Sequence, residues 1–234
     1  MNLMLKDKVI VVGGGAGGIG TALCETLRQE GALVIVADLV DGVDLANLQE
    51  VKNFFNQLRQ HHQTLYGYCS LVCGGGGEKG IIETDSNEIG KELRGTLLAA
   101  VYPIQKAIQW MKETGGGHIV VVSSINSVLG LNEFAYDLAK GALNRVAPDI
   151  ATGCGKHGIY ATTLCLGTVG GTPSWTGKEE VLEKIAGNIP DKKVTDVDEA
   201  AKVIAFLLSK RGEMFNGCTL LADRGWHLTK EFKS

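Results

Sequence analysis

The 234-residue chain lacks the features that mark membrane, secreted and nucleic-acid-binding proteins. No apolar run approaches the roughly 18 residues that a membrane helix needs, and residues 1–6 do not resemble a signal peptide. The net charge is −3 and the basic residues form no cluster, which argues against nucleic acid as a partner. We therefore expect a cytoplasmic protein whose main partners include no membrane and no nucleic acid.

The chain also lacks patterns that bind metals or divide a sequence into domains. Its six cysteines form no Cys-x-x-Cys pair and no zinc-ligand spacing, so we expect reduced thiols and no metal site. There are only four prolines, no Pro/Ser-rich linker and no internal repeat. Residues 1–234 are therefore expected to form one domain with a substantial core.

Short apolar segments alternate with helical patterns along the chain. Strands are expected near residues 8–12, 32–37, 69–73, 118–123, 159–165 and 218–222. Helices are expected over residues 18–30, 47–62, 87–113, 134–155, 179–187 and 197–209. This alternation predicts an α/β fold with a single doubly wound, Rossmann-type parallel sheet and helices on both of its faces.

A glycine-rich turn at residues 13–20 joins the first strand to the first helix, and the second strand ends in Asp38. The order of strand, glycine turn, helix, strand and acid is typical of a dinucleotide site. Gly14, Gly18 and Gly20 would permit close approach of a pyrophosphate. The helix N-terminus would offer it free N–H groups and a positive dipole.

Tyr136 and Lys140 lie four residues apart on an expected helix, so their side chains share one face. An ammonium beside a phenol favours the phenolate and is expected to lower the pKa of the tyrosine from its usual value near 10. A tyrosine of this kind can donate or accept a proton near neutral pH. Ser124 precedes it by twelve residues.

These motifs resemble the short-chain dehydrogenases/reductases, which combine the spacing Gly14-x-x-x-Gly18-x-Gly20 with downstream Ser, Tyr and Lys. Residues 117–124, 166–169 and 222–225 resemble further motifs of that family. The resemblance implies hydride transfer between a nicotinamide and a secondary alcohol or ketone. It assigns proton exchange to Tyr136, and contact with the substrate oxygen to Ser124. Lys140 would tune the tyrosine and bind the nicotinamide ribose.

Two serines compete for the catalytic role. Ser123 lies thirteen residues before Tyr136, the commoner spacing in the family, whereas Ser124 lies twelve before it. We favour Ser124, because the residues from Ser123 to Gly130 then align with the family pattern without a gap. The shorter spacing then falls in the loop that follows.

Three departures from the family pattern concern the same site. Residues 73–76 read Cys-Gly-Gly-Gly where the family has Asn-Asn-Ala-Gly, and Leu166 replaces a proline. Thr96 is expected in place of the helix asparagine that completes the family's catalytic tetrad. A threonine can hold one water with a different reach. The departures leave open a catalytically weakened protein that only binds NAD.

Asp38 indicates NAD(H) as the cofactor. Its carboxylate would accept hydrogen bonds from the ribose hydroxyls and repel a 2′-phosphate, and neither Gly17 nor Leu39 supplies a compensating cation. Residues 39–43 are too few for the usual next helix, so we expect residues 43–45 to form a stunted third strand with Asp44 near the adenine. The expected cofactor site comprises Gly14, Gly18, Ile19, Gly20, Asp38, Leu39, Asp44, Leu45, Cys73, Gly74, Gly75, Tyr136, Lys140, Gly167, Val169 and Thr172.

Three further expectations concern substrate and assembly. Residues 170–192 should form a mobile substrate lid, in which Trp175 either contacts substrate or packs in the core. A small alcohol or ketone is the favoured substrate, and a 3-oxoacyl thioester is the alternative. The broad apolar stripe of residues 87–111, with residues 134–154, predicts a helix interface in a homotetramer or homodimer.

Overall fold

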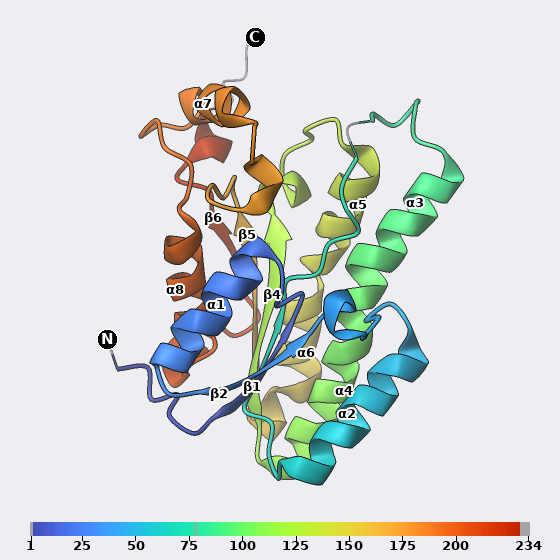
Figure 1. Ribbon diagram of the computed structural model, residues 1–234, viewed down its shortest axis with the longest axis vertical. Coiled ribbons are helices and arrows are strands. Elements are labelled where there is room, and N and C mark those ends of the chain that lie inside the picture. The colour runs from blue at the N-terminus through green and yellow to red at the C-terminus, as the bar shows by residue number, and fades with distance from the viewer. Residues whose placement is uncertain (1, 78, 230–234) are drawn as a thin grey trace.

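Six parallel strands form one sheet in the order β2-β1-β3-β4-β5-β6 (Figure 1). The computed structural model describes residues 2–77 and 79–229, and within them the sheet has this composition. The strands are β1 Val9–Gly13, β2 Leu33–Ala37, β3 Gly67–Ser70, β4 Gly117–Ser124, β5 Ile159–Leu166 and β6 Thr219–Ala222. The predicted strand at residues 69–73 begins two residues earlier and ends at Ser70.

Helices cover both faces of the sheet, which confirms the predicted doubly wound architecture. Helices α1 (Gly18–Gln29) and α8 (Val197–Leu207) pack together on one face. Helices α2 (Leu48–His61), α4 (Ala99–Thr114) and α6 (Val146–Cys154) cover the other (Figure 1).

The central strands are apolar throughout because both of their faces are buried. In β1, Ile10 and Val12 join the core beneath α1 and α8, whereas Val9 and Val11 join the core beneath α2, α4 and α6. This alternation follows from the period of two along a strand. Because all of these strands run parallel, their carboxyl ends lie at one edge of the sheet.

The prediction of a short third strand at residues 43–45 is wrong. A 3₁₀ turn, Leu39–Asp41, follows β2, and the chain then bends directly into α2. Side-chain acceptors take the backbone groups that a strand would need: Glu50 accepts from Asp44 N at 2.8 Å, and Asp44 accepts from Ala46 N at 2.8 Å. Such local bonds compete with a sheet ladder.

Two predicted helices are divided. The helix expected at residues 87–113 comprises α3 (Ser86–Glu92), a π-helical segment Leu93–Leu98 and α4, which run on as one rod. The helix expected at residues 134–155 breaks after α5 (Phe134–Leu143), and α6 begins at Val146. Pro148 lies in the first turn of α6, where its missing N–H costs no helical hydrogen bond.

The segment after β5 contains a 3₁₀ turn, Pro173–Trp175, and helix α7 (Glu179–Gly187), which matches its predicted bounds. No residue of α7 is buried, so this helix makes only limited packing contacts with the rest of the chain. Among the described residues, no helix is long and apolar enough to cross a membrane.

Candidate active site

A cavity of about 550 Å³ opens at the carboxyl ends of the strands. Its walls come from the glycine turn (residues 13–20), the ends of β3, β4 and β5, helix α5 and the lid segment (residues 170–192). Most of the predicted site residues line it: Gly14, Gly18, Ile19, Gly20, Cys73, Gly75, Ser124, Tyr136, Lys140, Gly167, Val169 and Thr172. Those that do not are Asp38, Leu39, Asp44, Leu45, Gly74 and Thr96.

The glycine turn fits an anion. Gly14 has a φ of +76°, and a Cβ at Gly20 would lie 2.3 Å from the Gly14 carbonyl oxygen, so neither position accommodates a side chain without strain. Helix α1 begins at Gly18 and its preceding residue, Gly17, provides no side-chain cap. The first N–H groups of α1 therefore face the cavity, where they and the helix dipole suit a pyrophosphate.

Asp38 stabilises the glycine turn from outside the cavity. One carboxylate oxygen accepts from Ala16 N at 3.1 Å, and the other accepts from Val40 N at 3.4 Å at the start of the 3₁₀ turn. A carboxylate offers about four acceptor sites, so these two bonds leave capacity for hydroxyl donors. The neighbouring Leu39 is 71% exposed.

The two candidate serines have different surroundings. Ser123 is buried and its hydroxyl donates to the Lys140 carbonyl at 2.9 Å, which anchors α5 to β4. Both serines line the cavity, but Ser124 is only partly buried. Its hydroxyl donates to Asn126 Oδ1 at 3.0 Å and hydrogen-bonds Tyr136. This placement favours Ser124 as the residue that contacts a substrate.

The expected direction of the Tyr136 pKa is wrong for this structure. Burial is the largest influence and raises the pKa of Tyr136 above its usual value, and the neighbouring Cys73, Glu133 and Glu92 add to the rise. The hydrogen bond with Ser124 opposes it. Although the helical spacing of Tyr136 and Lys140 was correct, the cost of desolvating a phenolate is the largest influence on the Tyr136 pKa.

Lys140 ties α5 to the sheet. Its side chain is buried, its Nζ donates to the Val122 carbonyl at 3.2 Å and to the Val72 carbonyl at 3.4 Å, and it lies 5.6 Å from the centre of the Tyr136 ring. Burial lowers the pKa of Lys140, whereas nearby Cys73, Glu92 and Cys165 raise it. An ammonium has three donors, so one N–H remains for a ligand in the cavity.

Thr96 is fully buried and does not line the cavity. Its hydroxyl accepts from Gly74 N at 2.7 Å and donates to Glu92 Oε1 at 2.5 Å. The carboxylate of Glu92 is one of the weaker influences that raise the pKa values of Tyr136 and Lys140, after Cys73 in both cases. Sequence reasoning missed Glu92, because a glutamate in a polar helical turn is usually solvated.

Sequence reasoning also missed Asn126, which organises the catalytic loop. Besides contacting Ser124, its amide donates to Asp137 Oδ1 at 2.8 Å and to Glu133 Oε2 at 3.4 Å. Its position two residues after Ser124 is the sequence feature that could have identified Asn126 as part of the site. The lid residue Trp175 lines the cavity and is only partly buried, and Trp226, Ile185 and Leu131 add further apolar surface.

Comparisons with known proteins identify the family of the chain. A family model described as enoyl-(acyl carrier protein) reductase matches residues 40–227. The chain belongs to the short-chain dehydrogenase/reductase family. Members of this family are oxidoreductases that act on CH–OH or C=O groups with a nicotinamide cofactor.

Similar proteins match almost the whole chain. An acetoacetyl-CoA reductase of Synechocystis sp. is 27% identical over 98% of this chain and 100% of its own. A 7alpha-hydroxysteroid dehydrogenase of Clostridium sardiniense is 25% identical over 88% and 87% of the two chains. The fold is also that of an aldohexose dehydrogenase from Thermoplasma acidophilum (TM-score 0.91, 22% identity, covering 100% of this chain and 99% of that one).

We predict that Gly20→Ala weakens NADH binding at least about tenfold, because the new Cβ overlaps the Gly14 carbonyl oxygen and displaces the helix N-terminus. Gly17→Ala is the matched control, since its Cβ would lie 3.5 Å from the same oxygen at a φ of −71°. Fluorescence titration with NADH measures the cofactor affinity of both variants. Equal affinities of the two variants would contradict the proposed anion site.

Proposed function

We propose that this protein is an NAD(H)-dependent oxidoreductase that transfers a hydride between nicotinamide and a secondary alcohol or ketone, with Tyr136 as the proton donor or acceptor. The observation that supports it is one cavity that combines Tyr136, Ser124 and Lys140 with the N-terminus of α1. The bound nicotinamide would supply or accept the hydride. The remaining steps fall to side chains of this chain.

In the reductive direction, the Ser124 hydroxyl would turn its proton from Asn126 Oδ1 to the substrate oxygen, and Tyr136 would donate a proton to that oxygen. The raised pKa of Tyr136 keeps the phenol protonated at neutral pH, which is the form that donates. Lys140, held by two carbonyl oxygens, would have one remaining N–H to offer to a ribose hydroxyl. Asn126 fixes the Ser124 hydroxyl in place.

The cofactor assignment rests on Asp38. Its carboxylate lies on the glycine turn and beside the end of β2, where it would accept from ribose hydroxyls and repel a 2′-phosphate. Asp44 and Leu45 follow it outside the cavity lining and remain part of the proposed adenine side. We also propose a cytoplasmic location.

The substrate end of the cavity favours a small or medium apolar molecule. Ile125, Leu131, Trp175, Ile185 and Trp226 line it, and the lid segment contributes two of these side chains. A 3-oxoacyl thioester is the second candidate, because the relatives include the acetoacetyl-CoA reductase and a human 3-oxoacyl-[acyl-carrier-protein] reductase that is 26% identical. A protein that binds NAD without turnover is the third.

The first test is turnover of ketones, secondary alcohols and acetoacetyl-CoA with NADH or NAD. We expect Tyr136→Phe to abolish turnover and to leave NADH affinity almost unchanged, because it removes only the proton-transferring oxygen. Lys140→Ala should reduce both the turnover and the NADH affinity. A Tyr136→Phe variant that keeps a tenth or more of the wild-type kcat would refute the role of Tyr136. Tight NADH binding by a wild type without turnover would support the third candidate.

The second prediction is that NADH binds at least about tenfold more tightly than NADPH, because the Asp38 carboxylate repels the 2′-phosphate. Asp38→Ser should remove most of this difference. Asp41→Ser, which removes another exposed carboxylate of the same turn, should leave it intact. Titrations of each protein with NADH and with NADPH measure the two affinities. Comparable affinities in the wild type would refute the assignment of NAD(H).

We further propose a homotetramer, built in part through α4 and α5. Leu97, Val101 and Ile108 on the first rod are only half-buried in one copy, and Leu138 on α5 is 45% exposed. Light scattering at micromolar concentration should return about four times the 24.9 kDa chain mass. The mass of a single chain would exclude the proposal, and the mass of two chains would exclude the tetramer and support a dimer.

A further inference from the structure

The lid segment (residues 170–192) is fastened to the rest of the chain near its two ends. The structure describes all of its residues, and only Gly170 and Ile189 among them are buried. At the first end, the Gly170 N–H donates to the Thr195 carbonyl at 2.8 Å. Helix α7, between the two ends, has no buried residue. The position of the lid therefore depends strongly on what holds the residues around Ile189.

The C-terminal segment, residues 223–229, contacts this second end of the lid. Trp226 belongs to one apolar cluster with Ile189 and with Ile125, which directly follows the proposed catalytic serine. Ile189 is 2% exposed in this cluster. We call residues 188–191 the lid anchor, because they are the part of the lid that packs against the C-terminal segment.

Arg224 joins the C-terminal segment to the lid anchor by ion pairs. Its Nε donates to Asp191 Oδ2 at 2.8 Å, and its Nη2 lies 2.7 Å from the same oxygen. Its Nη1 donates to Glu199 Oε2 on α8 at 3.1 Å. A guanidinium can bind two carboxylates at once because its donors form a rigid fork. The Thr229 hydroxyl adds a weaker link, since its one proton is shared between the Asn188 and Trp226 carbonyls, both at 2.8 Å.

Arg224 makes these contacts from a backbone conformation that favours glycine. Its φ is +55°, in the left-handed region. The turn around it is held by the buried carboxylate of Asp223, which accepts from Gly225 N at 3.1 Å and from His227 N at 2.7 Å. Glycine would fit position 224 with less strain. Arg224→Gly therefore removes the ion pairs without disturbing the turn.

The lid anchor also forms the wall of a cavity beside the active site. This neighbouring cavity, of about 460 Å³, is lined by Asn188, Ile189 and Pro190. Leu131 and Trp226 line both it and the active-site cavity. A movement of the anchor would therefore change the packing of Trp226, which is part of the apolar substrate end of the active site.

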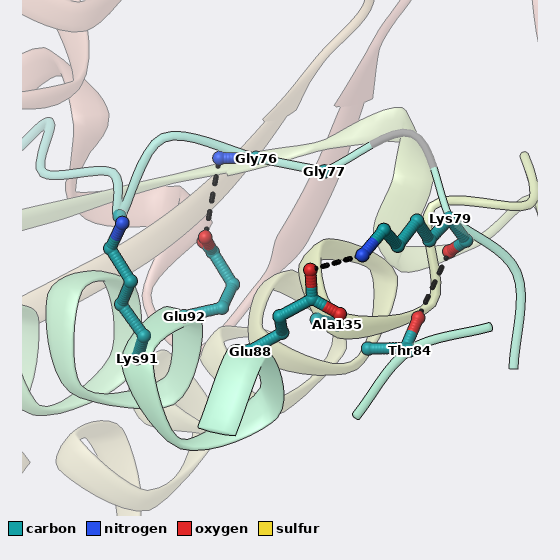
Figure 2. Close-up of a pocket in the computed structure, with 9 residues that line it drawn as sticks. Gly76, Gly77, Lys79, Thr84, Glu88, Lys91, Glu92 and Ala135 are labelled. Carbon is teal, nitrogen blue, oxygen red and sulfur yellow. Dashed lines mark hydrogen bonds and ion pairs between the residues drawn. The ribbon is translucent and has the colours of Figure 1, made fainter. Parts of the chain in front are cut away.

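The small cavity beside the Gly74 loop (residues 73–77) is built differently. Glu92 Oε2 accepts from Gly76 N at 3.2 Å there, and Lys79 pairs with Glu88 at 2.5 Å (Figure 2). These partners lie close together in the sequence. Arg224, in contrast, lies 33 residues from Asp191 and 25 residues from Glu199. Its ion pairs therefore fix distant segments relative to one another.

We propose that Arg224 is a positioning residue, which holds the lid anchor and, through it, the Trp226 wall of the substrate end. The proposal rests on the proposed function only in that this cavity binds the substrate. Exposed ion pairs are individually weak and shift an equilibrium by up to about fivefold each. Two of them matter here because the anchor has a single buried side chain, that of Ile189.

The first test is hydrogen–deuterium exchange in the protein without cofactor, measured by mass spectrometry on peptides that span residues 186–192. In this stretch, Ile189 N donates to the Ala186 carbonyl and Lys192 N to the Ile189 carbonyl, both at 3.0 Å. Arg224→Gly should speed exchange there at least about threefold, because local opening of the anchor no longer breaks the ion pairs.

Lys79→Gln is the matched control for this measurement. It removes the cation of an ion pair that does not touch the lid, so exchange of residues 186–192 should stay at the wild-type rate. A wild-type rate in Arg224→Gly would overturn the proposal, and so would an equal acceleration in Lys79→Gln.

Asp191→Asn tests the same contact from the lid side and covers the case in which Arg224→Gly does not fold. Its amide oxygen can still accept from Lys193 N, as the carboxylate does at 3.3 Å, so the local turn is kept. Exchange of residues 186–192 should again be faster. In an Arg224→Gly background, the additional effect of Asp191→Asn should largely disappear. Full additivity would show that Asp191 acts without Arg224 and would overturn the proposal.

Catalysis provides a second readout, with a ketone that the wild type reduces. Arg224→Gly should raise the KM for the ketone at least about threefold and leave kcat and NADH affinity within about twofold, because the residues that exchange the proton are not displaced. Arg224→Lys can keep one of the two ion pairs and should restore part of the KM. An unchanged KM, or a loss confined to kcat, would overturn the role in substrate binding. A wild type without turnover would refute the proposed function, whereas the exchange rates would still decide whether Arg224 holds the anchor.

Discussion

The active-site end of the molecule depends on how one buried ammonium is held. Lys140 bridges the chain just after β3 and the end of β4 through two carbonyl oxygens, and the Ser123 hydroxyl fastens the Lys140 carbonyl to β4. Helix α5 is therefore fixed at one height above the sheet. Because Tyr136 lies one helical turn earlier, its position over the cavity is set by the same contacts. A buried cation needs such partners, since an unsatisfied one is costly.

The parts of this arrangement that the sequence predicts are local. The glycine turn, the helix that follows it and the shared face of Tyr136 and Lys140 each follow from spacing within a few residues. The sheet follows from the alternation of apolar strands with helices. What the sequence did not predict depends on contacts between distant residues. The Tyr136 pKa is raised because the folded chain buries the phenol, and spacing contains no measure of burial.

Two further failures have the same origin. Residues 43–45 have strand-like composition, but Glu50 from the next helix takes the backbone N–H of Asp44. Glu92 looks like an ordinary surface residue of a helix that carries several charges. It is buried only because the Gly74 loop folds across it and offers two N–H groups, one of them through Thr96. Neither partner lies within one helical turn in the sequence.

These contacts give a physical reason for the departures from the family pattern at the Gly74 loop. Without side chains the loop cannot brace itself, and with them it could not approach a carboxylate at this distance. The glycines and Glu92 therefore depend on each other. The loop N–H groups satisfy the buried carboxylate, and the carboxylate and Thr96 hold the loop in place. A change at either position alone leaves a buried charge without its N–H donors or a methyl group against an oxygen. Since Lys140 donates to the Val72 carbonyl, directly before this loop, the loop and Glu92 also border the contacts that hold Lys140 in place.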